Sequence, residues 1–187
     1  MSKNLYSATS LIFFINNKDL ILEFREKLLN LKKSEKTILD KLRIEKGLFH
    51  EAEYFKQLSK KYKKVKNIKS LKNLSRDEKI KETNEAIRSG YELIYGGWLK
   101  SGDWIGELDF LAINNSIKSD LGNWSYEIID TKYTSKVKGD HVYQLCLYSF
   151  LLKEVQGILS KNFYIALKDG TKEKIKLNEV YESFLSQ

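Results

Sequence analysis

Cysteine is almost missing from this chain of 187 residues, since Cys146 is the only one. A single cysteine excludes an intramolecular disulfide, and it excludes the four-cysteine sites that hold structural zinc or an iron–sulfur cluster. Proline is absent altogether, and we know of no physical reason for its absence. The apolar stretch at residues 11–15 is too short for a signal-peptide core or a membrane span. We therefore expect a cytoplasmic protein with no membrane partner.

The composition is that of an ordinary globular protein, with 42% hydrophobic and 31% charged residues. The length fits a single domain over residues 1–187, with a helical N-terminal region at 1–45 and the core at 46–187. The net charge is +8, from 33 lysines and arginines against 25 acids. This excess favours an anionic partner, either nucleic acid or an anionic surface. A lysine-rich surface also promotes solubility, so charge alone does not decide.

Helical periodicity dominates the first half of the chain. It predicts helices over residues 20–31 and 34–62, the second broken near Gly47, with Leu48, Ala52, Phe55 and Leu58 as its buried stripe. Residues 60–81 hold nine lysines and one arginine against two acids. This basic segment is equally explained as a solvated surface or as a track for a nucleic-acid backbone. It should contain a short strand at 65–68, and a capped helix over 77–89 should follow.

After residue 90 the period changes to that of strands. Strands are expected at 91–98 and 105–113, joined by a turn at 100–103, and again at 126–133. A helix over 140–155 should lead to a strand at 163–167. A tight turn then gives a strand at 174–177 and a short helix capped by Asn178. This order predicts an α/β fold with a mixed central β-sheet flanked by helices.

Three charged residues interrupt the apolar strands. Asp130 and Lys132 lie two residues apart, so their side chains share one face of a strand with Ile128. Asp109 lies inside the apolar strand at 105–113. Two carboxylates on neighbouring strands offer the hard oxygen ligands that suit Mg²⁺ or Mn²⁺, and a lysine beside them can act on a bound water. The alternative for each residue alone is a structural ion pair or an edge position.

Polar residues also mark two of the expected helices. Gln144 and Tyr148 are four apart and share a face, with His141 close to it, whereas Cys146 belongs to the opposite, core-like stripe. His50 and Glu51 lie together on an amphipathic helix. Taken alone, that pair is explained as two surface residues.

Four stretches, taken in order, resemble the motifs of RecB-like nucleases of the PD-(D/E)XK superfamily. They are residues 47–51, 106–111, 126–132 and 144–148. The resemblance covers nearly the whole chain and implies a restriction-endonuclease-like core. It implies that His50, Asp109 and Asp130 bind the metal ion together with the backbone carbonyl of Thr131.

The same resemblance implies roles for the remaining motif residues. Lys132 would be the catalytic lysine, and Gln144 and Tyr148 would steady that lysine or the DNA strand. Glu51 would support the metal ligands from a second layer. The cofactor implied is Mg²⁺ or Mn²⁺, without the iron–sulfur cluster that several RecB-like relatives carry.

The activity implied is hydrolysis of phosphodiester bonds in DNA, at single strands or ends, in repair, recombination or processing. Such domains often accompany an RNase H-like domain or a helicase, so a subunit of either kind is an expected partner. Without those domains, we expect a stand-alone nuclease, a split gene product or a remnant. The alternative is a catalytically inactive or partner-dependent nucleic-acid-binding subunit of a helicase–nuclease complex.

Overall fold

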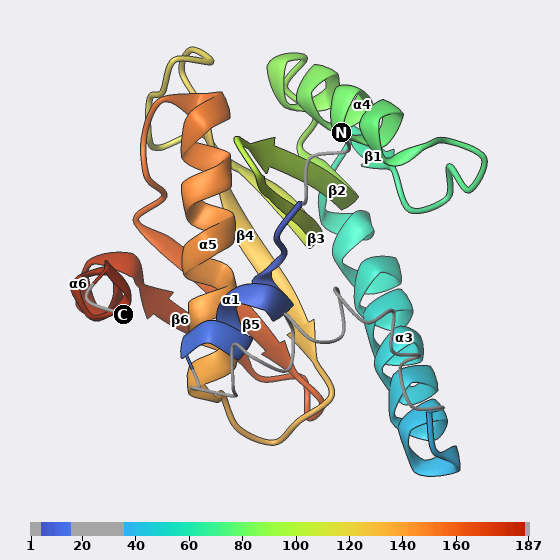
Figure 1. Ribbon diagram of the computed structural model, residues 1–187. Coiled ribbons are helices and arrows are strands. Elements are labelled where there is room, and N and C mark those ends of the chain that lie inside the picture. The colour runs from blue at the N-terminus through green and yellow to red at the C-terminus, as the bar shows by residue number, and fades with distance from the viewer. Residues whose placement is uncertain (1–4, 16–35, 186–187) are drawn as a thin grey trace.

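A six-stranded sheet in the order β1-β2-β3-β4-β5-β6 forms the centre of the protein, whose computed structural model describes residues 5–15 and 36–185 (Figure 1). The strands are β1 (Val65–Asn67), β2 (Leu93–Ser101), β3 (Trp104–Asn114), β4 (Ser125–Lys132), β5 (Asn162–Leu167) and β6 (Lys172–Lys176). The pairs β1–β2 and β4–β5 are parallel, and the other three pairs are antiparallel. The predicted α/β class with a mixed central sheet is therefore confirmed.

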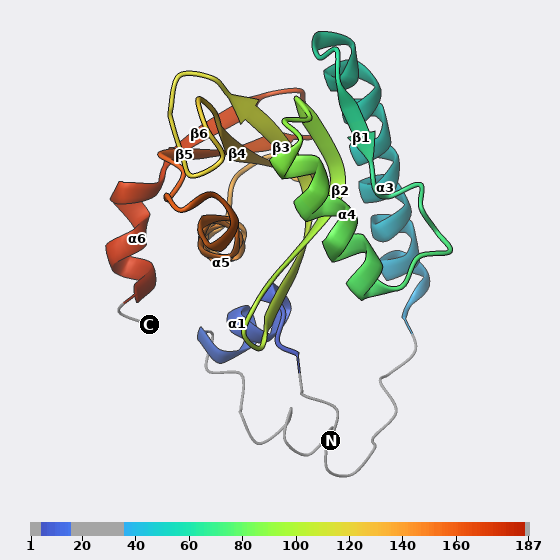
Figure 2. The same ribbon diagram turned by 90° about the horizontal axis from the view of Figure 1, so that it is seen from above.

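Helices cover both faces of this sheet. They are α1 (Ala8–Ile15), α3 (Ile38–Leu58), the short 3-10 helix η1 (Ser59–Lys61), α4 (Arg76–Arg88), α5 (Gly139–Gln156) and α6 (Leu177–Leu185). Figure 2 shows α5 and α3 on opposite sides of the sheet. The helix expected at residues 20–31 lies outside the described residues. Among the helices described, none combines the length and the apolar character needed to cross a bilayer.

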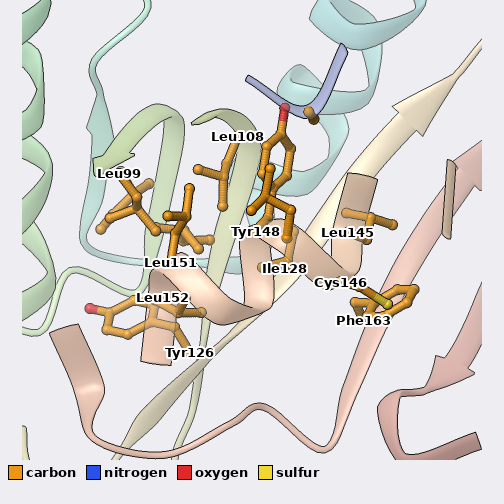
Figure 3. Packing of buried hydrophobic residues seen from close by; sticks show 14 of the residues in the cluster. Leu99, Leu108, Tyr126, Ile128, Leu145, Cys146, Tyr148, Leu151, Leu152 and Phe163 are labelled. Atoms are coloured by element: carbon orange, nitrogen blue, oxygen red, sulfur yellow. The ribbon is translucent and has the colours of Figure 1, made fainter. Parts of the chain in front are cut away.

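Helix α5 is the crossover that makes β4 and β5 parallel, because two parallel neighbours need a connection of this length. It ends at Gly157, whose φ of 75° is the left-handed conformation common at helix ends. The helix buries Leu145, Leu151 and Leu152 against the sheet. Figure 3 shows these side chains interleaved with those of the strands. The position of α5 over β3 and β4 brings its polar residues to the middle of the sheet.

The opposite face of the sheet carries a smaller aromatic core under α3. Phe55 stacks on Tyr95 with ring centroids 4.2 Å apart, and Tyr95 stacks on Phe110 at 5.1 Å. Leu58 and Ile129 belong to the same cluster. Stacked aromatic rings contribute about 0.5–1.5 kcal/mol per pair beyond the area that they bury. Helix α3 is therefore anchored through its C-terminal half.

Two expectations for α3 are wrong. The helix is not broken at Gly47: it begins after the cap residue Thr37 and runs unbroken through Leu58. Its buried stripe is also not the expected one, because Leu48 and Ala52 are exposed while Phe55 and Leu58 pack on the sheet. The N-terminal half of α3 extends away from the sheet (Figure 1), so apolar residues there do not meet the core.

Smaller differences concern boundaries. The long N-terminal helix was expected from residue 34, but Thr37 caps it with a reciprocal hydrogen-bond pair to Asp40. The last helix begins at Leu177, so Asn178 lies inside it and does not cap it. Helix α3 also crosses the expected boundary at residues 45 and 46 without interruption.

Candidate active site

The candidate site lies where β3 and β4 part. Their last hydrogen-bonded pair is Phe110 with Ile129, and the next residues in that register are Asp109 and Asp130. Beyond this point β4 continues alongside β5, with Asp130 opposite Ile165. Asp109 bridges the gap through its side chain: Oδ2 accepts a hydrogen bond from Thr131 N at 2.7 Å and from Thr131 Oγ1 at 2.6 Å. The two aspartates are therefore held on adjacent strands at one opening in the sheet.

The pairing on the other side of Asp109 is interrupted too. Strand β2 pairs Tyr95 with Phe110 and Gly97 with Leu108, but the pair between them is missing. Gly96 occupies this unpaired position of β2, and its φ of +69° is a left-handed conformation. A Cβ atom on Gly96 would lie only 2.6 Å from the Cβ atom of Lys69. Glycine is required at this point, and the backbone around Asp109 is locally irregular.

Asp130 is a buried acid with an incomplete set of partners. Only 1% of its surface is exposed. Its Oδ2 lies 2.7 Å from Lys132 Nζ, and apart from this ion pair it has no hydrogen-bond partner among the described residues. Burial and the nearby charge of Asp109 raise the pKa of Asp130 above its usual range, although Lys132 opposes them. A second cation near this atom would oppose both effects, because it would stabilise the ionised carboxylate.

Lys132 is held by a chain of polar side chains that reaches α5. Its Nζ donates to Gln144 Oε1 at 3.0 Å, and Gln144 Nε2 donates to the hydroxyl of Tyr148 at 3.0 Å. Burial lowers the pKa of Lys132, but the carboxylates of Asp130 and Asp109 raise it by more, so the ammonium stays charged. Gly106 lets the Tyr148 ring pack on β3, because a Cβ there would lie 2.6 Å from the ring.

The resemblance implied a supporting role for Glu51, but the sequence did not predict its partner, Lys69. Glu51 is buried at 7% exposure and forms an ion pair with Lys69, so its interpretation as a surface residue is wrong. Burial raises the pKa of Glu51, and the negative charge of Asp109 raises it further. The signal was present, because Glu51 lies one turn before Phe55 and two turns before Leu58. The burial of Glu51 was not predicted because a different stripe of α3 was expected to face the sheet.

His50 occupies a different position from the two aspartates. Its Nε2 lies 3.4 Å from the carbonyl oxygen of Ala166, and its ring meets that of Tyr133 edge-on at 5.9 Å. Ala166 is opposite Thr131 in the sheet, so His50 lies at the border of the site. Within residues 5–15 and 36–185, no three side chains of histidine, cysteine, aspartate or glutamate group closely enough to hold a metal ion. The structure therefore does not place His50 in one ligand set with Asp109 and Asp130.

Two further residues of α5, His141 and Cys146, are not part of the candidate active site. The Nδ1 atom of His141 accepts a hydrogen bond from Lys138 N at 3.2 Å. Burial and the nearby charge of Lys132 lower the pKa of His141 to about 4, so this ring is neutral at physiological pH. Cys146 is fully buried, and burial raises the pKa of its thiol to about 12. It is a core residue and not a nucleophile.

The donor set fits a hard divalent cation that retains much of its water. Mg²⁺ is commonly held by one or two protein carboxylates together with waters and substrate phosphates, without a closed protein cage. Asp109 and Asp130 are two such carboxylates, and Asp130 Oδ2 is a buried acceptor with an unfilled position. Burial first, and then the nearby charge of Asp109, raise the pKa of Asp130, so a bound cation would stabilise its ionised form.

Comparisons with known proteins add little. No model of a protein family matches the chain, and no curated protein matches it either. Among solved structures, the crystal structure of SSO0001 aligns with a TM-score of 0.29 and 16% sequence identity, over 90% of this chain and 87% of that one. At that TM-score the likeness carries no argument about fold or function.

Proposed function

We propose that the protein is a metal-dependent nuclease of the RecB-like, PD-(D/E)XK kind that hydrolyses phosphodiester bonds in DNA. One observation carries the proposal: Asp109, Asp130 and Lys132 meet where two strands part, and a buried oxygen of Asp130 has Lys132 as its sole described partner. A buried acid with unmet coordination beside a fixed lysine is costly to maintain for structure alone. It is the arrangement expected of a phosphoryl-transfer site.

Asp109 and Asp130 would hold a Mg²⁺ or Mn²⁺ ion, with the backbone carbonyl of Thr131 as a further oxygen ligand. When bound, such an ion polarises the phosphate and lowers the pKa of a coordinated water. Lys132 is positioned by Asp130 and Gln144, so its ammonium group can hold a water or a phosphate oxygen in place. Tyr148 fixes the amide of Gln144 and thereby its carbonyl oxygen toward the lysine.

The cleavage reaction itself provides the first test. Asp109→Ala should abolish both Mn²⁺ binding and cleavage, since it removes a ligand. Lys132→Ala should keep Mn²⁺ binding, because losing a nearby positive charge favours a cation. Its cleavage rate should nevertheless fall by about 10²–10³-fold, the usual cost of removing one positioned group that stabilises charge in the transition state. The measurements are titration calorimetry with Mn²⁺ and cleavage of labelled single-stranded DNA, double-stranded DNA and RNA.

Lys153→Ala is the matched control, because Lys153 is exposed on α5 and far along the helix from Gln144. It should bind Mn²⁺ and cut like wild type. If Lys132→Ala cuts as fast as this control, the lysine is only an ion-pair partner and the mechanism is wrong.

A partner-dependent, inactive subunit of a helicase–nuclease complex is the second candidate. The observation that bears on it is the position of His50, whose Nε2 lies 3.4 Å from the carbonyl oxygen of Ala166 at the border of the site. Binding of Mn²⁺ and DNA by the wild-type protein without cleavage of any of the three substrates would support this candidate over the first.

A further inference from the structure

A groove of about 400 Å³ opens beside the polar chain of the site. Helix α1, the start of α4, the β2–β3 hairpin and α5 contribute to its walls. Gln144 and Tyr148, which position Lys132, also line this groove. The segment before α1 is fixed along the hairpin, because Tyr6 N donates to Asp103 O and Ile105 N donates to Tyr6 O. The groove is therefore a built feature that shares two residues, Gln144 and Tyr148, with the candidate active site.

The wall of this groove presents an aromatic ring with a cation over it. Trp98 of β2 is partly exposed, and the guanidinium carbon of Arg76 lies 5.4 Å from the centre of its indole. The backbone beneath the indole is fixed, since Trp98 N donates to Thr83 Oγ1 at 2.9 Å. Arg76 is exposed at the first turn of α4. A flat ring on a fixed backbone is a stacking surface, and a base that stacks on the face under Arg76 would take the place of its guanidinium. The displaced guanidinium would then be available to a phosphate, the group that arginine is best suited to bind.

The charges in the groove limit what it can bind. Its described lining contains Arg76 and also Glu107, which is opposite Trp98 in the ladder between β2 and β3. The two charges offset each other, so a polyanionic surface has little electrostatic advantage here. A ligand with one aromatic ring and one phosphate matches the lining better. A larger hollow of about 650 Å³, between β6 and α6, shares no described residue with the site.

We infer that this groove binds one unpaired nucleotide of the substrate strand, with its base stacked on Trp98 and its phosphate held by Arg76. The inference rests on the proposed nuclease function and deepens it, because it assigns one residue to stack on a base of the substrate strand and another to hold its phosphate. In a duplex the faces of the bases are covered by their neighbours, and only an unpaired base can offer a free face to the indole. The strand would then pass Gln144 and Tyr148 on its way to Lys132.

Binding and cleavage should be measured separately. Anisotropy with labelled oligothymidylate, oligouridylate and a blunt duplex gives the affinities. Trp98→Leu should bind both single strands about 5- to 100-fold more weakly, which is the usual contribution of one base stacked on an aromatic ring. Trp98→Phe should restore most of the affinity, because it keeps a flat ring. Arg76→Gln should weaken binding of the single strands as well, and the duplex should respond to none of these changes.

The control variants are Trp124→Phe and Arg88→Gln. Trp124 packs against Gly90 and Gly122 away from the groove, and Arg88 is at the other end of α4. Both should bind like wild type. The subsite is refuted if Trp98→Leu and Trp98→Phe bind single strands equally well, or if the duplex loses as much affinity as the single strands. Absence of cleavage by wild type would refute the nuclease and leave the stacking result standing.

Discussion

At the residue scale, the candidate active site concentrates negative charge in a largely buried environment. Burial raises the pKa of both Asp130 and Glu51, and in both cases the charge of Asp109 adds to the effect. A carboxyl group with a raised pKa favours its protonated form in the folded protein. The ionised acids of this site are therefore locally destabilising in the protein without a bound cation.

Glu51→Gln tests this cost by its dependence on pH. Because the folded pKa of Glu51 lies above the unfolded value, its contribution to stability is fully present below the unfolded pKa. That contribution is lost as the pH rises through the folded pKa. Glutamine removes the cost, so the variant should be more stable than wild type at pH 8, and the gain should shrink toward pH 4. Urea denaturation across this range measures the difference.

Glu53→Gln is the control on the same helix, because Glu53 forms only an exposed ion pair with Lys56. It should show no comparable pH-dependent gain. If Glu51→Gln is instead less stable than wild type at pH 8, the ion pair with Lys69 outweighs the burial of the acid.

At the element scale, two glycines should respond oppositely to alanine. Gly47 lies inside α3, and a Cβ added there would meet no atom within 4 Å, so Gly47→Ala should stabilise the protein by about 0.5–1 kcal/mol. Gly96 has a φ of +69° and lies against Lys69, so Gly96→Ala should destabilise it by at least about 1–2 kcal/mol. Thermal denaturation of both variants measures the two changes in stability. A destabilised Gly47→Ala would mean that α3 bends at this residue.

The order of elements after residue 60 could be predicted from the sequence, because each strand and helix has its own period of apolar residues. The sequence could not show which side of α3 faces the sheet, because that helix carries apolar residues on more than one side. Asp109, Asp130 and Lys132 could be singled out as charges in apolar strands. The parting of β3 and β4 beside them depends on sheet register, and the pairing of Glu51 with Lys69 joins two segments whose contact the sequence does not encode locally.

At the scale of the whole molecule, the net charge of +8 is concentrated in part in the basic segment at residues 60–81. Several of its lysines are already engaged: Lys64 donates to Ser89 O, and Lys66 and Lys69 form ion pairs with Glu82 and Glu51. Other lysines of the segment are exposed, with no ion pair found among the described residues; they are Lys60, Lys61, Lys63 and Lys72. These four are the ones available to a nucleic-acid backbone.

Replacing these four lysines by glutamine should weaken nucleic-acid binding equally for all sequences and flatten its dependence on salt. A second variant with the same change of net charge replaces exposed lysines elsewhere, namely Lys118, Lys153, Lys161 and Lys174. Affinities measured over a series of salt concentrations give the two slopes. Equal slopes for both variants would show that the basic segment is an ordinary solvated surface.

The pairing of β3 with β4 ends before Thr131, and the Asp109 side chain accepts the hydrogen bond that the Thr131 amide would otherwise donate to a backbone carbonyl of the neighbouring strand. We therefore expect the exchange of this one proton with solvent to depend on the Asp109 carboxylate more than on the backbone pairing of the sheet. It should follow the occupancy of the site while the amides of Ile128 and Ile129 follow the stability of the fold. The Thr131 amide should therefore report the occupancy of the candidate site, and amide hydrogen exchange can measure it without any substrate.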